Sequence, residues 1–198
     1  IAGALLGAAL GHNFDKGMKS LPGAEGFEAG DRERVQTAFF TATFSVMGHL
    51  AKADGRVSRA EIALAEAVMA QMGLNGQQRR VAIDLFTRGK QADFPWRDAV
   101  RQFRKECHGR SQLLRIFLEI QIQAAYADGG LTTAEEQMLL RICRDLGFSE
   151  VEFRQLEQMI RELEQLAGDH SEDYFEHEGT LFFRHIQDNA LLYRILLE

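Results

Sequence analysis

The stretch KADGRVSRAEI occupies residues 52–62, and a closely similar stretch, YADGGLTTAEE, occupies residues 126–136. Each contains an Asp-Gly pair, an apolar residue, a hydroxyl residue and, three positions after the hydroxyl, a glutamate. This order has two interpretations. It is half of a calcium-binding loop, or it is the end of one helix followed by the start of the next.

The helix-start interpretation explains every position of the repeated stretch. Ser58 and Thr132 precede Glu61 and Glu135 by three residues, which is the spacing of a capping box. In a capping box the hydroxyl accepts a hydrogen bond from the amide of the third helical residue, and the glutamate accepts one from the amide of the cap. The glycine of each Asp-Gly pair can adopt the left-handed conformation that ends the preceding helix.

The similarity between the two copies continues at a constant offset of 74 residues. Gly73 aligns with Gly147, where the helix of each copy is predicted to stop. Two residues later, Asn75 aligns with Ser149, and each is predicted to cap a further helix with Gln or Glu at its third position. Each copy therefore has the order helix, loop, helix, glycine stop, helix.

These patterns predict an all-α bundle of about seven to eight helices built from two pseudo-repeats, residues 38–89 and 112–163. Only two prolines occur in 198 residues, which favours helices. The segment 113–125 is apolar almost all round, as is its counterpart around residues 39–51, so both are expected to be central helices. The bundle is predicted to span residues 31–167.

An EF-hand is excluded by the ligands that the loops lack. Such a loop needs oxygen ligands at positions 1, 3 and 5, glycine at 6 and glutamate at 12. The first copy supplies only the later positions, because positions 1 and 3 are Leu50 and Lys52. In the second copy they are Ala124 and Tyr126, which are equally unsuitable.

A weaker metal site remains a hypothesis. If the two loops face each other, their acidic residues would converge on one divalent cation. The candidate ligands are Asp54, Glu61, Asp128 and Glu135. Capping already accounts for the two glutamates, so both interpretations stay open. We expect no other cofactor.

The formal net charge of −6 is unevenly distributed along the chain. Residues 79–115 contain ten Lys/Arg and four Asp/Glu, whereas residues 116–198 contain six and seventeen. A nucleic-acid-binding role would favour a basic domain overall, so we expect none. The basic segment suits a polar protein partner better, with a plain solvated surface as the alternative.

The segment PWRDAVRQFRKECHGR (95–110) is the best candidate for a partner-binding surface. One face is an apolar stripe, and the other carries most of the basic residues of the segment. Arginines on such a face steer the association with an acidic partner. The predicted partner-binding residues are Trp96, Arg97, Arg101, Arg104 and Lys105.

Catalytic motifs are absent from the sequence. It has no Gly-rich phosphate loop, HExxH or GxSxG motif, so we do not expect an enzyme. Cys107 and Cys143 are too few for a disulfide framework. His49, one turn before the first loop, is predicted to be a packing histidine.

The N-terminal end indicates a membrane anchor. The chain begins with Ile1 and continues with IAGALLGAALGH, in which Gly3, Gly7 and Gly11 lie four residues apart. Small residues at this spacing allow two membrane helices to approach closely. The stretch is shorter than the roughly 20 apolar residues of a complete span. We therefore interpret residues 1–30 as the end of an anchor followed by a Gly-rich linker, with a soluble segment as the alternative.

The phrase ADG(R/G)(V/L)(S/T)xxE resembles the tellurite-resistance TerB-like family. The longer runs RVQTAFFTATFSVMGHLAKADGRVSRAEI and RQFRKECHGRSQLLRIFLEIQIQAAYADGGLTTAEE are similar to the DnaJ-like membrane co-chaperones that contain a TerB-like domain. The resemblance covers about residues 1–160. It also associates the paired acidic loops with metal.

This resemblance implies a bacterial inner-membrane protein with its helical domain facing the cytoplasm. One N-terminal helix would anchor it and help it form a homodimer. A C-terminal J domain would stimulate the ATPase of a DnaK-type chaperone through a His-Pro-Asp tripeptide.

The sequence departs from this family at its C-terminal end. The tripeptide does not occur, since the only prolines are Pro22 and Pro95. The J domain therefore lies outside this chain, or the protein is a stand-alone TerB-like module for metal response or stress signalling. Residues 168–198 match nothing in the family and are interpreted as a polar bridge and a C-terminal helix.

Overall fold

A computed structural model describes residues 29–107 and 109–168. The described residues form seven α-helices and no strand, which confirms the predicted fold class. The helices are α2 (Ala29–Leu50), α3 (Arg59–Gln71), α4 (Gly76–Gly89), α5 (Trp96–Glu106), α6 (Ser111–Tyr126), α7 (Thr133–Leu146) and α8 (Glu150–Gly168). The predicted anchor end and the segment after residue 168 lie outside the described residues, and so does most of the linker.

The two copies of the repeat correspond to α2–α3–α4 and α6–α7–α8, with α5 between them. Helices α3 and α7 begin at Arg59 and Thr133, and α4 and α8 begin at Gly76 and Glu150, so both pairs keep the offset of 74. Helix α2 begins at Ala29, inside the predicted linker.

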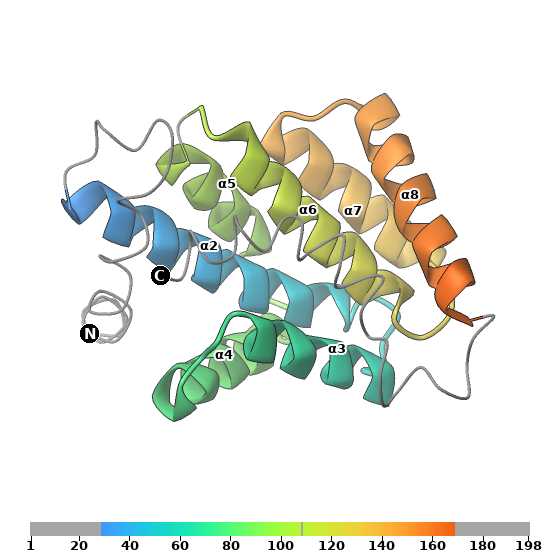
Figure 1. The fold of residues 1–198 in the computed structure, drawn as a ribbon, viewed down its shortest axis with the longest axis horizontal. Helices are drawn as coiled ribbons and strands as arrows, with labels where there is room; N and C mark the ends of the chain where they lie inside the picture. The colour runs from blue at the N-terminus through green and yellow to red at the C-terminus, as the bar shows by residue number, and fades with distance from the viewer. Residues whose placement is uncertain (1–28, 108, 169–198) are drawn as a thin grey trace.

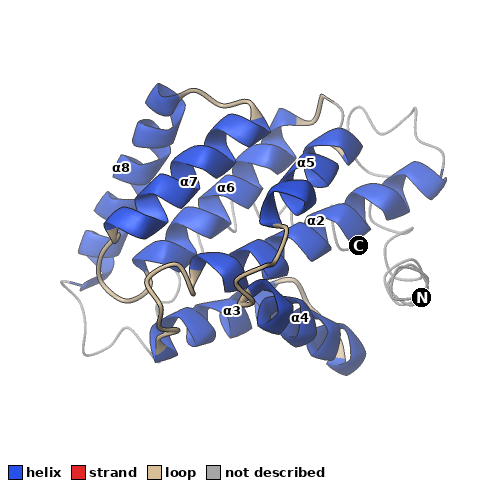
Figure 2. Ribbon diagram, turned by 180° about the vertical axis from the view of Figure 1, so that it is seen from behind, coloured by secondary structure: helices blue, strands red, loops and turns tan. Residues whose placement is uncertain are grey.

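Helix α2 runs through the middle of the molecule. It packs against α4 on one side and against α5 and α6 on the other (Figure 1). Helices α5, α6, α7 and α8 lie together on the side of α2 opposite to α4, as both views show (Figure 1 and Figure 2). Helix α7 contacts α5, α6 and α8.

Aromatic rings join α2, α5 and α6 in the core. The Phe103 ring of α5 lies between Phe39 of α2, at a centroid distance of 5.6 Å, and Phe117 of α6, at 5.0 Å. All three side chains are fully buried. The predicted central helix α6 is buried without a break from Ile116 to Ala125.

The crossing of α2 and α4 is a contact between backbones. A Cβ atom added at Gly48 of α2 would lie 2.0 Å from the carbonyl oxygen of Phe86 in α4. A Cβ atom at Gly89 of α4 would lie 1.9 Å from the carbonyl oxygen of Ser45 in α2. Only glycine at both positions allows the two helices to approach so closely.

We predict that Gly48→Ala destabilises the fold by about 3 kcal/mol, because a backbone carbonyl cannot rotate away as a side chain can. Urea unfolding followed by circular dichroism measures the change. Gly76→Ala is the matched control, since a Cβ atom there has no neighbour within 4 Å. An equal loss of stability in both variants would contradict the role of the crossing.

Candidate functional site

The twin loops form the capping boxes that the sequence predicts. In the first, the Ser58 hydroxyl accepts from the amide of Glu61 at 3.1 Å, and the Glu61 carboxylate accepts from the amide of Ser58 at 2.6 Å. In the second, Thr132 and Glu135 make the same pair of bonds at 3.3 and 2.9 Å. Both glutamates are buried, with 5% and 3% of their surface exposed.

The glycines and the second pair of caps are also as predicted. The glycines of both Asp-Gly pairs and of both stops have positive φ angles: Gly55, Gly73, Gly129 and Gly147. Asn75 forms a capping box with Gln78 at the start of α4. Ser149 makes the same reciprocal bonds with Glu152 at the start of α8.

The four acidic residues of the loops are close enough to repel one another. Burial raises the pKa of the Glu61 carboxyl; hydrogen bonds from Ser58 oppose the shift, and the charges of Asp128 and Glu135 add to it. Burial likewise raises the pKa of the Glu135 carboxyl. Hydrogen bonds from Thr132 oppose this rise, and the charges of Asp128 and Asp54 add to it. The acidic residues of each loop therefore raise the pKa of the glutamate in the other loop, which is expected if the two loops face each other.

The arrangement of these carboxylates suits capping better than metal binding. Glu61 and Glu135 turn back to the amides of their own caps, and Asp54 accepts from the amide of Arg56 at 2.9 Å. Within residues 29–107 and 109–168, no group of three or more His, Cys, Asp or Glu side chains is placed to hold a metal ion. The metal site stays a prediction.

The predicted partner-binding residues at the start of α5 are engaged within the fold. Trp96 is half-buried, and its ring stacks on His49 at a centroid distance of 6.3 Å. The Arg97 guanidinium lies 5.4 Å from the centroid of the Trp96 ring, and its Nε is 3.2 Å from Asp145 Oδ2. Asp145 Oδ2 accepts no hydrogen bond from any residue that the structure describes, so the contact with Arg97 is an ion pair without a hydrogen bond. His49 packs as predicted, with Nδ1 donating to the Gly89 carbonyl at 2.9 Å.

The basic residues further along α5 surround an open pocket of about 360 Å³. Its lining consists of Arg101, Arg104, Lys105, Arg144 and Asp145. Arg104 donates from Nη1 to the Asp145 carbonyl at 3.0 Å, which caps the C-terminal end of α7. The structure thus brings together three of the predicted residues, adds Arg144 from α7, and leaves Trp96 and Arg97 outside the lining.

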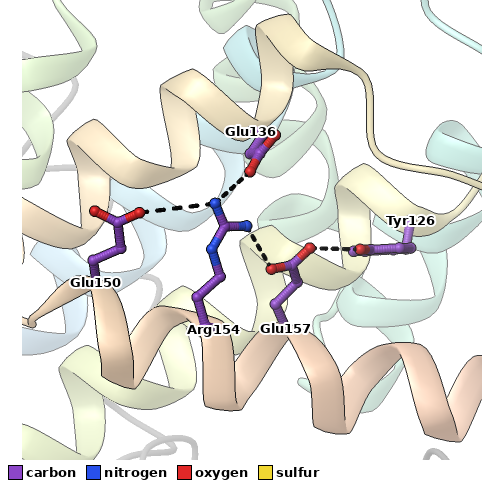
Figure 3. Close-up of polar contacts among 5 residues, drawn as sticks. All are labelled: Tyr126, Glu136, Glu150, Arg154 and Glu157. Carbon is purple, nitrogen blue, oxygen red and sulfur yellow. Dashed lines mark hydrogen bonds and ion pairs between the residues drawn. The ribbon is translucent and has the colours of Figure 1, made fainter.

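An ion-pair cluster that sequence reasoning missed joins the helices of the second copy (Figure 3). Arg154 of α8 contacts Glu136 of α7 at 2.6 Å and Glu157 of its own helix at 2.8 Å. Glu157 accepts a hydrogen bond from the Tyr126 hydroxyl of α6 at 2.9 Å. Burial, followed by this bond to a carboxylate, raises the pKa of Tyr126 to about 12. The spacing of Glu150, Arg154 and Glu157 was the one sequence signal for this cluster.

Comparison with known proteins assigns the chain to a family. The sequence profile described as tellurite resistance protein TerB matches residues 40–158, and the chain belongs to this family. This confirms the resemblance seen in the repeated ADG phrase. No solved structure matches the chain.

The curated relatives carry the name co-chaperone protein DjlA. The chain is 45% identical to the protein of Yersinia pestis over 168 residues, and 45% identical to that of Salmonella typhimurium and 44% to that of Escherichia coli strain K12 over 166 residues. These alignments cover 84–85% of this chain and 60% of each relative. The chain therefore spans less than two thirds of the relatives that it matches.

The part of the chain that the structure describes contains no helix long and apolar enough to cross a membrane. The predicted anchor end, in residues 1–12, lies outside that part.

We predict that Glu135→Gln makes the fold more stable at neutral pH and equally stable at acid pH. The folded-state pKa of this carboxyl lies above its unfolded-state value, so the folded chain holds the proton more tightly. That stabilisation is present below the unfolded-state pKa and is lost as the pH rises through the folded-state pKa. A glutamine is always neutral, and Gln78 already shows that it completes the box, accepting from Asn75 at 2.9 Å.

Urea unfolding between acid and neutral pH measures this effect, and Glu61→Gln should give the same sign. Glu152→Gln is the control, because hydrogen bonds from Ser149 lower the pKa of that exposed carboxyl. Its stabilisation is present above the unfolded-state pKa and is lost as the pH falls, so this variant should lose stability at neutral pH. The same pH profile for all three variants would contradict the assignment.

Proposed function

We propose that this chain is the TerB-domain portion of a membrane-anchored DnaJ-like co-chaperone. The observation that carries the proposal is the identity of 44–45% to proteins named co-chaperone DjlA across 84–85% of the chain. The aligned length of 166–168 residues exceeds the 40–158 range of the TerB profile. All members of the TerB family share the domain itself. The similarity to the DjlA proteins also includes sequence that flanks the domain.

In this proposal the helical domain acts as an interaction module and not as an enzyme. Its buried carboxylates are used in helix caps, as in Glu61 and Glu135, or in an ion pair, as in Glu119 with Arg115, and the cations of the α5–α7 pocket lie at the surface. A J domain outside this chain would regulate or stimulate a DnaK-type chaperone. Residues 1–30 would anchor the protein in the bacterial inner membrane and support a homodimer, with the helical domain in the cytoplasm.

The coding sequence from which this chain derives provides the test. We expect it to continue into a helix pair that carries His-Pro-Asp, and we expect the complete protein to stimulate the ATPase of DnaK. The control replaces the histidine of that tripeptide by glutamine, which should abolish stimulation and leave the helical domain folded. A complete protein without the tripeptide, or one that leaves the ATPase rate unchanged, would contradict the co-chaperone proposal.

A stand-alone metal-responsive or stress-signalling TerB module is the second candidate. The mutual repulsion of the loop carboxylates favours it, because a divalent cation between them would relieve that repulsion. Asp54 and Asp128 are exposed and lie outside the capping boxes, so they are the ligands that can be changed without loss of a cap.

If this candidate is right, calorimetric titration with calcium, zinc or manganese will give saturable heat. The variant Asp54→Asn/Asp128→Asn should remove that heat while its helix content stays the same. Absence of heat with the unmodified chain at about 1 mM metal, an affinity limit of roughly −4 kcal/mol, would exclude a metal role for the loops.

A further inference from the structure

The pocket between α5 and α7 is lined almost entirely by charged side chains. Arg101, Arg104 and Lys105 approach it from α5, and Arg144 approaches it from α7. The acidic group in its lining, Asp145, is already paired with Arg97. Four cations from two helices thus surround one open volume, in a chain whose formal net charge is −6.

Three of these cations form no ion pair or hydrogen bond within the described residues. Arg104 is held by its hydrogen bond to the Asp145 carbonyl. Arg101, Lys105 and Arg144 are exposed, and none of their side chains forms an ion pair or hydrogen bond with a described residue. By contrast, Arg97, Arg115 and Arg154 all form ion pairs. The pocket therefore combines one fixed guanidinium with three cations that are available to a ligand.

The chemistry of the lining selects among anionic ligands. Guanidinium groups bind carboxylates through paired hydrogen bonds, and this pocket offers three of them. Among the described residues, the lining contains no aromatic side chain on which a nucleotide base would stack. A peptide carboxylate on a flexible side chain can enter such a pocket without a flat stacking surface.

The charge of the whole chain opposes an extended anionic surface. An acidic protein is repelled by a membrane of anionic lipids or by a nucleic acid, except within the Debye length of about 8–10 Å around a local basic site. The large apolar side chains exposed in the described residues, Ile62, Ile83 and Val151, lie on other helices, so α5 offers none for membrane insertion. A short acidic segment requires only the local field.

We propose that the pocket formed by Arg101, Arg104, Lys105 and Arg144 binds a carboxylate-rich segment, with closely spaced Asp or Glu residues, of a partner protein. The proposal rests on the proposed role of the helical domain as an interaction module, and it specifies the chemical nature of the partner that the module binds. It narrows the predicted surface, because Trp96 and Arg97 serve the fold, and it extends the surface to α7.

The test measures binding to this chain alone, so its result does not depend on a J domain or on DnaK. The probe is a fluorescent peptide of six consecutive glutamates, and a peptide of six glutamines is the reference. Fluorescence anisotropy should show saturable binding of the glutamate peptide only, and the binding should weaken as the salt concentration rises.

The variants separate the pocket from general charge effects. Arg101→Glu and Arg144→Glu, one from each helix, should each weaken binding about fivefold or more, because each replaces an attraction by a repulsion. Arg80→Glu is the matched control: this arginine of α4 is exposed and its side chain also has no described partner. It should change binding less than about twofold. Circular dichroism and the midpoint of thermal unfolding verify that all three variants fold.

Four outcomes would overturn the proposal. The first is no binding of the glutamate peptide at about 1 mM, and the second is an equal loss of peptide affinity in the Arg80→Glu and Arg101→Glu variants. The third is a loss of peptide affinity in Arg101→Glu without a loss in Arg144→Glu. The fourth is preferential binding of another anion. For the last outcome, inorganic phosphate and phosphatidylglycerol vesicles are titrated in parallel. A loss of peptide binding in both pocket variants, with the control unchanged, supports the proposal even if the complete protein does not stimulate DnaK.

Discussion

The backbone contact between α2 and α4 fixes the framework on which the other helices pack. Gly48 and Gly89 each face a carbonyl oxygen of the opposite helix, so no side chain separates the two backbones. Next to this contact, His49 donates to the Gly89 carbonyl and stacks on Trp96 at the start of α5. The crossing is thereby in contact with the start of α5. Because α2 also packs against α6, this helix of the first copy joins the first copy to the second.

The two copies solve the same packing problem in different ways. At the offset of 74, Gly48 corresponds to Ile122 and Gly89 corresponds to Leu163. The position of Gly48 is thus occupied on α6 by a fully buried isoleucine. In addition to its apolar core, the second copy has polar contacts between its helices, in which Arg154 links α8 to α7 and Glu157 links α8 to Tyr126 of α6. The copies share their helix caps because caps are local, whereas their contacts between helices have diverged.

The difference between local helix caps and contacts between helices explains which features of the fold could be predicted from the sequence. A capping box is specified within four residues, so the capping boxes of α3, α4, α7 and α8 were all predictable, as were the left-handed glycines next to them. Gly48 gave no signal, because a glycine inside an apolar helical run lowers helix propensity without indicating its neighbour. Arg144 joins the α5 pocket only through tertiary packing, across about forty residues of chain. Trp96 and Arg97 were predicted to serve a partner, but one sequence cannot show that His49 and Asp145 engage them.

Two groups of charges in the domain have different consequences for its function. The buried glutamates of the twin loops are bound to backbone amides, so a ligand could use them only by disrupting the helix starts that define the fold. The cations of the α5–α7 pocket have the opposite property. Arg101, Lys105 and Arg144 contribute no described hydrogen bond or ion pair to the fold, and a partner can engage them without any rearrangement of the helices. This division of charges leaves the basic side chains at the α5–α7 junction available for recognition of a partner, whereas the glutamates of the twin loops are committed to helix starts. It also allows the partner to differ among relatives, because substitution of an unpaired surface cation changes the stability of the domain by only a few tenths of a kcal/mol.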